Sequence, residues 1–306
     1  MPDLPGLHSG AGRFAPSPSG ELHLGNLRTA ILAWLFARST GRRFLLRIED
    51  LDRARAGAEA EQLRDLALIG LDWDEAPIRQ SDRVARYREA LDRLRGQGRL
   101  YECFCTRRDI AEAASAPHQA PGRYPGTCRS LSETERARKR SERPAAWRLR
   151  SDVAEFRIHD RQHGEFRGPV DDFVLLRNDG VTAYNLAVVV DDALQGVDQV
   201  VRGDDLLAAA PGQAYLASLL GYPVPGYAHV PLALNPAGQR LAKRDGAVTL
   251  ADVGRDAALG LIFGSLGLPP ALPAALAEFD PARLPREAWL VRPAPGHGTN
   301  NVGAGR

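Results

Sequence analysis

RFAPSPSGELHLGN, at residues 13–26, is the stretch of the sequence that decides the fold. Residues 13–15 are predicted to end a short strand. Pro16 and Pro18 then exclude regular structure, because proline fixes φ and lacks an N–H. From Leu24 onward apolar residues recur at helical spacing, which predicts a helix. Free N–H groups at a helix start favour anions such as phosphate, although an ordinary strand–helix connection would fit this stretch equally well.

The composition is that of a globular protein. The chain has 306 residues, 44% of them hydrophobic and 25% charged, with a net charge of +2, which is enough chain for more than one domain and gives no general preference for nucleic acid. Lysine is rare, so the place of Lys243 in a predicted loop is informative. The sequence contains no run of 18 consecutive apolar residues, so no membrane span is expected. No signal peptide is recognisable. These features predict a cytoplasmic protein.

Strands and helices are predicted to alternate, which favours a parallel α/β sheet. Residues 44–48 fit a buried strand that ends in the acidic residues Glu49, Asp50 and Asp52, at the sheet edge where α/β proteins bind ligands. The other expected elements are helices over 58–69 and 83–95, an apolar run over 183–190, a strand over 197–201, a helix over about 205–220, a strand over 230–234 and a helix over about 251–266.

Residues 101–180 interrupt this alternation and are predicted to be an inserted α+β subdomain. They contain the cysteines, a polar run over 129–143 that is best explained as a solvated helix face, and short strands separated by turns. The expected division of the chain is a loose leader over 1–11, a first α/β half over 12–100, the insertion over 101–180, a second α/β half over 181–245, a short helical region over 246–292 and a disordered tail over 293–306.

Three cysteines, Cys103, Cys105 and Cys128, lie close together in the insertion. An odd number in so short a segment does not indicate a disulfide framework. A structural zinc usually has four ligands, and His118 would complete the set on residue type alone. Three buried thiols without a metal are the alternative interpretation.

Several motifs together resemble the class I aminoacyl-tRNA synthetases. HLGN, from His23 to Asn26, resembles the HIGH signature, and RLAKR, at residues 240–244, resembles the KMSKS signature. RFAPSPSG at 13–20 and RIEDLD at 47–52 are similar to the glutamyl branch of the class. The resemblance covers roughly residues 12–266. It implies a Rossmann-like parallel sheet with an inserted zinc-containing subdomain and a short helical C-terminal part.

The resemblance implies that the chain is an enzyme that joins glutamate to the α-phosphate of ATP and releases pyrophosphate. Such catalysis works mainly by positioning and electrostatic stabilisation, with His23 and Lys243 as the catalytic residues. Mg²⁺ is expected with ATP, held mostly by the phosphates and water. The ATP-binding residues implied by the resemblance are His23, Gly25, Asn26, Arg240 and Lys243.

The same resemblance implies a glutamate site made of Arg13, Ser17, Glu49, Tyr184 and Arg202. Glu49 would bind the ammonium group, Tyr184 would add a hydroxyl, and Arg202 would bind the side-chain carboxylate with its two-pronged guanidinium. The alternatives are an ion pair of Arg202 with Asp204 or Asp205, and a helix cap or surface ion pair for Glu49.

Both signatures of the class contain departures. Asn26 replaces the second histidine of HIGH, and it can still donate a hydrogen bond. Arg240 and Ala242 replace the first lysine and the serine of KMSKS, and Arg240 keeps the charge. These departures concern the details of ribose and phosphate binding rather than the reaction.

Cys-x-Cys followed by Tyr-x₃-Cys resembles the zinc site of the short glutamyl enzymes, which implies Tyr124 as the fourth ligand beside Cys103, Cys105 and Cys128. A phenolate ligand is plausible because a metal ion lowers the pKa of its ligands. His118 remains the alternative.

Only 62 residues follow Arg244, too few for the anticodon-binding region of a full glutamyl enzyme. The chain is therefore expected to resemble the truncated bacterial paralogues, which implies transfer of glutamate to the queuosine base at the wobble position of tRNA(Asp). The partner would be the tRNA(Asp) anticodon stem-loop, with arginines of residues 136–143 as candidate phosphate contacts, and the protein would be a monomer. The alternatives are a non-tRNA acceptor, a conventional glutamyl-tRNA synthetase and an inactive RNA-binding paralogue.

Overall fold

The computed structural model describes residues 10–52, 54–106, 108–110, 124–239, 241 and 248–291. The expected tail, nearly all of the expected leader, His118, Arg240, Ala242 and Lys243 lie outside these residues. Within them, no helix combines the length and the apolar character that a bilayer crossing requires.

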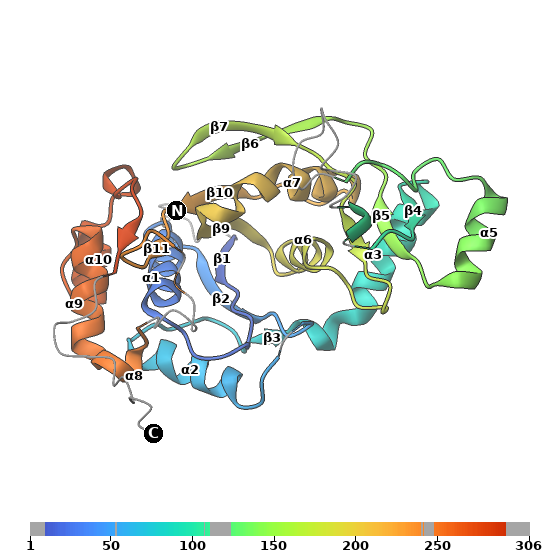
Figure 1. Cartoon of the computed structure of the whole chain (residues 1–306). Coiled ribbons are helices and arrows are strands. Elements are labelled where there is room, and N and C mark those ends of the chain that lie inside the picture. Colours follow the sequence, from blue (N-terminus) through green and yellow to red (C-terminus); the bar gives the residue numbers. More distant parts are fainter. Residues whose placement is uncertain are drawn as a thin grey trace, which may run out of the picture.

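A seven-stranded sheet forms the centre of the molecule (Figure 1). All neighbouring strands are parallel except the last two, which form an antiparallel hairpin. The predicted parallel α/β fold is therefore confirmed. The strands in sheet order are β3 (Ile78–Arg79), β2 (Arg43–Ile48), β1 (Ala11–Phe14), β9 (Val197–Gly203), β10 (Gly226–Val230), β6 (Glu155–Asp160) and β7 (Gly164–Pro169).

Helices cover both faces of this sheet. Helix α1 (Leu24–Arg38) packs on β1, β2 and β9, and α6 (Tyr184–Leu194) lies on the other side of β1 (Figure 1). Because α1 is also covered by the C-terminal helices, it is apolar and buried on nearly all sides. The other helices are α2 (Ala58–Leu68), α3 (Val84–Gly96), α7 (Ala210–Leu219), α8 (Leu250–Val253), α9 (Arg255–Leu266) and α10 (Leu272–Glu278), with short 3₁₀ helices η1 (Gln80–Arg83), η2 (Asp204–Ala209) and η4 (Pro281–Arg283).

The interruption of the α/β pattern contains a small antiparallel sheet with the order β4–β5–β8. Helix α5 (Glu133–Glu142) lies at its outer end, starts with a capping box of Ser132 and Glu135, and buries none of its residues. The predicted solvated helix is thus confirmed. The hairpin β6–β7 also comes from residues 101–180, but it extends the main sheet. The remaining strands are β4 (Leu100–Cys103), β5 (Ala146–Leu149), β8 (Val174–Leu176), β11 (Ala233–Leu234) and β12 (Trp289–Leu290).

Two expected elements differ in the structure. The apolar run over 183–190, which the sequence pattern assigns to neither a strand nor a helix, forms helix α6, whose residues 186–190 pack in a core shared with α3 and α7. The strand expected over 230–234 ends at Val230, since Pro231 lacks the N–H that would continue it. The helix expected over 251–266 is divided into α8 and α9 at Gly254, where φ is +78°.

Candidate functional site

Two adjoining cavities open at the carboxyl ends of the parallel strands, where ligands bind in α/β folds. The larger is a cleft of about 660 Å³, lined by most of residues 14–26, by Glu49 and Tyr184, and by residues at or after the ends of β9 and β10. The smaller has about 350 Å³, and both volumes are in the range of small-molecule sites. The residues that line both are Ser17, Ser19, Glu49 and Tyr184.

His23 and Asn26 fix each other at the start of α1. The backbone N–H of Asn26 donates to His23 Nδ1 at 3.2 Å, and the backbone N–H of His23 donates to Asn26 Oδ1 at 3.2 Å. Since Nδ1 accepts, the neutral ring carries its proton on Nε2. Both residues line the cleft. The departure at Asn26 therefore has a local explanation, because its side chain closes the cap of the helix.

Gly25 lets the helix start pack closely against its surroundings. A Cβ atom at this position would lie 3.0 Å from the side chain of Ala233 and 3.0 Å from the His23 ring. Leu24 N–H donates to the carbonyl of Val248 at 2.9 Å, and His23 bridges to Thr249. Leu241 also lines the cleft, so residues on both sides of 242–247 lie at this site.

Gln62, which the sequence analysis did not single out, supports the proline-containing loop from α2. Its amide donates to the carbonyls of Ser17 at 3.0 Å and Gly20 at 2.6 Å, and only 2% of the residue is exposed. The backbone N–H of Glu49 donates to the carbonyl of Pro16 at 3.0 Å. The signal that could have identified Gln62 was a polar residue on the otherwise apolar, buried face of α2.

A buried group of charges lies beneath the cleft. Asp192 of α6 accepts from Arg13 Nε at 3.1 Å and lies 2.8 Å from Arg47 Nη1. Burial opposes the ionisation of Asp192, but the positive charges of Arg13 and Arg47 outweigh it and hold its pKa below the ordinary value. The two arginines come from β1 and β2, so Asp192 connects three elements of the fold.

Glu49 stands between this group and the cleft. Arg47 Nη2 lies 3.5 Å from Glu49 Oε1, and the Glu49 side chain is 10% exposed. Burial raises the pKa of Glu49, and the charges of Arg47 and Arg13 offset only part of the rise. Glu49 is thus a buried carboxylate that a cation in the cleft would stabilise, and neither of the two alternatives considered for it, a helix cap or a surface ion pair, describes its surroundings.

Arg202 is a buried cation in β9, 6% exposed. Its Nε–H donates to His229 Nε2 at 3.0 Å, its Nη2 approaches the Leu206 carbonyl at 3.4 Å, and its guanidinium lies over the Tyr227 ring. No ion pair with Asp204 or Asp205 is found among the described residues. A buried charge without a counterion is costly, which makes Arg202 a candidate for an anionic ligand.

The expected glutamate-site residues fall into two layers. Ser17, Glu49 and Tyr184 line the cavities, whereas Arg13 and Arg202 lie behind the lining. Tyr184 lines both cavities and is 40% exposed; partial desolvation and then the charge of Glu49 raise its pKa, while the charges of Arg202 and Arg13 oppose the rise.

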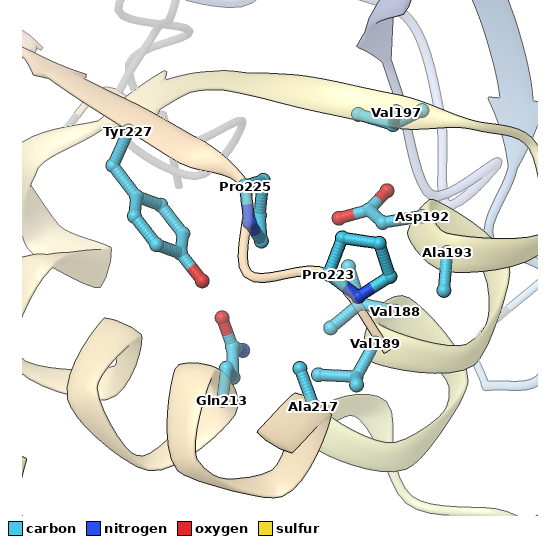
Figure 2. Close-up of a pocket in the computed structure, with 10 residues that line it drawn as sticks. All are labelled: Val188, Val189, Asp192, Ala193, Val197, Gln213, Ala217, Pro223, Pro225 and Tyr227. Atoms are coloured by element: carbon cyan, nitrogen blue, oxygen red, sulfur yellow. The ribbon is translucent and has the colours of Figure 1, made fainter. Parts of the chain in front are cut away.

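A very small cavity of about 10 Å³ is bordered by Asp192, Gln213 and Tyr227 (Figure 2). This space is about what a single water molecule needs. It is therefore too small for a substrate, and the two larger cavities remain the candidate site.

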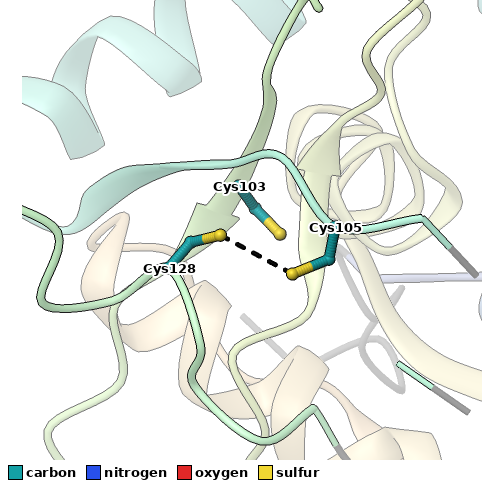
Figure 3. Close-up of side chains that lie close together, drawn as sticks. All are labelled: Cys103, Cys105 and Cys128. Atoms are coloured by element: carbon teal, nitrogen blue, oxygen red, sulfur yellow. Dashed lines mark hydrogen bonds between the residues drawn. The ribbon is translucent and has the colours of Figure 1, made fainter. Parts of the chain in front are cut away.

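The three cysteines converge in the insertion, with sulfur atoms within 4.8 Å of one another (Figure 3). The Tyr124 hydroxyl oxygen joins them, 3.3 Å from Cys103 Sγ and 3.7 Å from Cys105 Sγ. A hydrogen bond from Cys128, together with those from Tyr124 and Arg148, lowers the pKa of the Cys103 thiol to about 4 despite its burial. These four residues form a donor set that can hold a metal ion.

Some of the charged side chains of the polar helix α5 are bonded to other groups of the protein. Arg140 bonds to Glu102 and Glu133, and Arg143 donates to the Phe104 carbonyl at 2.8 Å beside the cysteine cluster. These bonds tie the helix to the strand that carries Cys103. Arg138 and Lys139 make no ion pair with any described residue.

Comparison with known proteins defines the class first. A family model described as the catalytic domain of class I tRNA synthetases for E and Q matches residues 11–259, and the chain belongs to this family. A glutamate tRNA ligase from Elizabethkingia meningosepticum, solved in complex with its amino acid, is 26% identical with a TM-score of 0.79, covering 92% of this chain and 67% of that one. The glutamate-tRNA synthetase of Elizabethkingia anophelis is 27% identical with a TM-score of 0.80, covering 93% and 68%.

Curated relatives narrow the family further. A protein of Nocardia farcinica is 66% identical over 92% of this chain and 93% of its own length, and one of Cutibacterium acnes is 50% identical over 97% and 85%. Both are named glutamyl-Q tRNA(Asp) synthetase. The chain is a member of the glutamyl-Q tRNA(Asp) synthetase family, which confirms the predicted resemblance.

The buried charges give a stability prediction. Asp192→Asn leaves Arg13 and Arg47 without their shared carboxylate, and we expect a loss of about 3–5 kcal/mol in the free energy of unfolding. Because the pKa of Asp192 is lowered on folding, its stabilisation is present above the unfolded pKa and is lost as the pH falls through the folded one. The variant should therefore show a weaker pH dependence on the acid side.

Asp198→Asn is the matched control. Asp198 pairs with Arg42 at 2.8 Å but is 46% exposed, so its loss should cost about 1 kcal/mol or less. Urea unfolding of both variants at several pH values measures the difference. Equal losses for the two variants would contradict the central place given to Asp192.

Proposed function

We propose that this chain activates glutamate with ATP and transfers it to the queuosine base at the wobble position of tRNA(Asp). The observation that carries the first half is a pair of buried, opposite charges near Tyr184. Glu49 offers a carboxylate to the substrate ammonium, and Arg202 offers a guanidinium to its side-chain carboxylate. Ser17 and Tyr184 add hydroxyl groups, and Arg13 supports the site from behind through Asp192.

ATP would occupy the larger cleft with its phosphates at the start of α1. The α-carboxylate of glutamate attacks the α-phosphate of ATP. The bond from that phosphorus to the oxygen bridging to the β-phosphate breaks, and pyrophosphate leaves with the electron pair. His23 Nε2–H and the backbone N–H of Gly25 suit the charge that develops on the phosphate, whereas the N–H groups of Leu24 and Asn26 are bonded within the fold. Gly25 and Asn26 shape this end. Lys243 and Arg240 would neutralise the departing pyrophosphate, and Mg²⁺ would bind chiefly through phosphate oxygens.

The acceptor is proposed from the relatives, which carry the name glutamyl-Q tRNA(Asp) synthetase at up to 66% identity. The smaller cavity supports the proposal, since it adjoins the cleft at Glu49 and Tyr184 and is bordered by Asp52 and Arg177. A splayed nucleotide of an RNA loop is a target that proteins bind readily. On α5, Arg138 and Lys139 are the better candidates for phosphate contacts, because Arg140 is already paired. The enzyme would act as a monomer in the cytoplasm, where tRNA and ATP are found.

Transfer of labelled glutamate to purified tRNA(Asp), with and without queuosine, tests this function. We expect transfer only to the queuosine-containing tRNA, and none to tRNA(Glu). Nuclease digestion distinguishes glutamate attached to the modified base from glutamate esterified at the 3′ end. Equal charging of unmodified tRNA(Asp), or charging of tRNA(Glu), would contradict the proposed acceptor while leaving glutamate activation intact.

We also propose that the cysteine cluster holds one structural Zn²⁺ through Cys103, Cys105, Cys128 and Tyr124. Tetrahedral zinc with Zn–S bonds of about 2.3 Å separates its sulfur ligands by about 3.8 Å. The 3.6 Å between Cys105 Sγ and Cys128 Sγ is close to this value. The ion would hold β4 to the following loop, below helix α5.

Measurements of metal content test the site. We expect one zinc per wild-type chain, none in Cys128→Ser, and a weaker zinc affinity in Tyr124→Phe. His118→Ala is the matched control and should keep its zinc. Elemental analysis after dialysis against a chelator measures all four. Loss of zinc from His118→Ala, with retention by Tyr124→Phe, would show that His118 and not Tyr124 is the fourth ligand.

A further inference from the structure

Three buried polar residues lie side by side on neighbouring strands behind the cleft. Arg202 of β9 and His229 of β10 are register partners, and Asp160 ends β6, the next strand of the sheet. Asp160 and His229 are fully buried, and Arg202 is 6% exposed. Neither Asp160 nor His229 has a role in the proposed glutamate or ATP site.

Their hydrogen bonds run in one direction. His229 Nδ1 donates to Asp160 Oδ2 at 2.6 Å, and Arg202 Nε–H donates to His229 Nε2 at 3.0 Å. An imidazole that donates from Nδ1 and accepts at Nε2 is neutral and in a single tautomer. Burial, aided by the charge of Arg202, lowers the pKa of His229 even though the bond to Asp160 opposes this shift, which agrees with a neutral ring.

Asp160 is itself held firmly. Its Oδ1 accepts the backbone N–H groups of Gln162 at 2.9 Å and His163 at 3.0 Å, and its Oδ2 also accepts the backbone N–H of His229 at 3.1 Å. The carboxylate is thus fixed by the turn between β6 and β7, and it can fix the imidazole. The chain of bonds therefore transmits the position of this turn to Arg202.

Because the imidazole of His229 is neutral, it does not cancel the positive charge of Arg202. A carboxylate bonded directly to Arg202 would cancel its positive charge and compete with an anionic ligand. His229 instead orients the guanidinium through Nε and places one ring between it and Asp160. The other bond of Arg202 goes to the Leu206 carbonyl at 3.4 Å, and no described residue accepts from Nη1. A guanidinium oriented in this way keeps both charge and donors for a carboxylate.

We infer that Asp160 and His229 are positioning residues that orient Arg202 for the side-chain carboxylate of the amino acid substrate. The inference rests on the proposed role of Arg202 in glutamate binding. It assigns part of the substrate specificity to the β6–β7 hairpin, which belongs to residues 101–180 and adds to the sheet beside β10.

Two amide substitutions separate positioning from simple packing. The His229→Asn amide reaches the place of Nδ1, so it keeps the bond to Asp160 and leaves Arg202 without its acceptor. The longer His229→Gln side chain reaches the place of Nε2 and can still accept from Arg202. Both replace the same buried ring, so their losses of stability should be similar.

Glutamate-dependent ATP–pyrophosphate exchange measures the effect on the full-length protein. We expect His229→Asn to raise the KM for glutamate by about 10- to 100-fold, the range for a lost hydrogen bond to a charged group. His229→Gln should raise it by several-fold less, and the KM for ATP should change less than about twofold in both. Equal changes in the two variants, or equal changes for glutamate and ATP, would overturn the inference.

A measurement on the wild-type protein avoids any failure of the variants to fold. ¹⁵N NMR of the imidazole-labelled chain should show His229 with its proton on Nδ1, and the Nε2 signal should shift when glutamate is added and not when ATP is added. A proton on Nε2, or no response to glutamate, would overturn the inference. A wild-type protein without glutamate-dependent exchange would instead overturn the proposed function, and this inference with it.

Discussion

The ion pairs of Asp192 with Arg13 and Arg47 are the interaction on which the rest of the structure depends. Arg13 is the penultimate residue of β1, the strand that leads into the proline-containing loop. Arg47 precedes Glu49 by two residues, and Asp192 belongs to the helix that begins with Tyr184. One buried carboxylate therefore holds together parts of the fold that lie far apart in the sequence. Since breaking a buried pair leaves uncompensated charge, the positions of the loop, of Glu49 and of Tyr184 are coupled to each other.

The site above this network has a simple electrostatic logic. Glu49 and Arg202 are both buried, and each lacks a full counterion among the described residues, so a ligand that brings a cationic group to Glu49 and an anionic side chain to Arg202 can complete them. The proposed Asp160–His229 support agrees with this logic, because it orients Arg202 without neutralising it. Glutamate has these groups, and glutamine has the same shape without the second negative charge. At the proposed site, selection of the amino acid would thus follow from charge more than from volume.

Much of the fold and of the candidate site could be predicted from the sequence. The rest could not be predicted, for physical reasons. The 13–26 stretch predicts its own strand, loop and helix, because Pro16, Pro18 and the apolar spacing after Leu24 act locally. The partners of Arg202 could not be predicted, since His229 and Asp160 meet it only through the strand order β9–β10–β6. Gln62 acts on a loop 42 residues away. Helix α6 was ambiguous for a different reason, as a short apolar run fits a buried strand as well as a buried helix.

The rate of ATP–pyrophosphate exchange with glutamate and with glutamine, measured side by side, tests the central claim most directly. The two substrates differ in the charge of one terminal group, so they probe the buried Arg202 and little else. A site built to bind a charged group rejects an analogue that leaves its buried donors poorly matched. The account predicts a preference for glutamate of at least about 100-fold in kcat/KM. Comparable exchange with glutamine would contradict it.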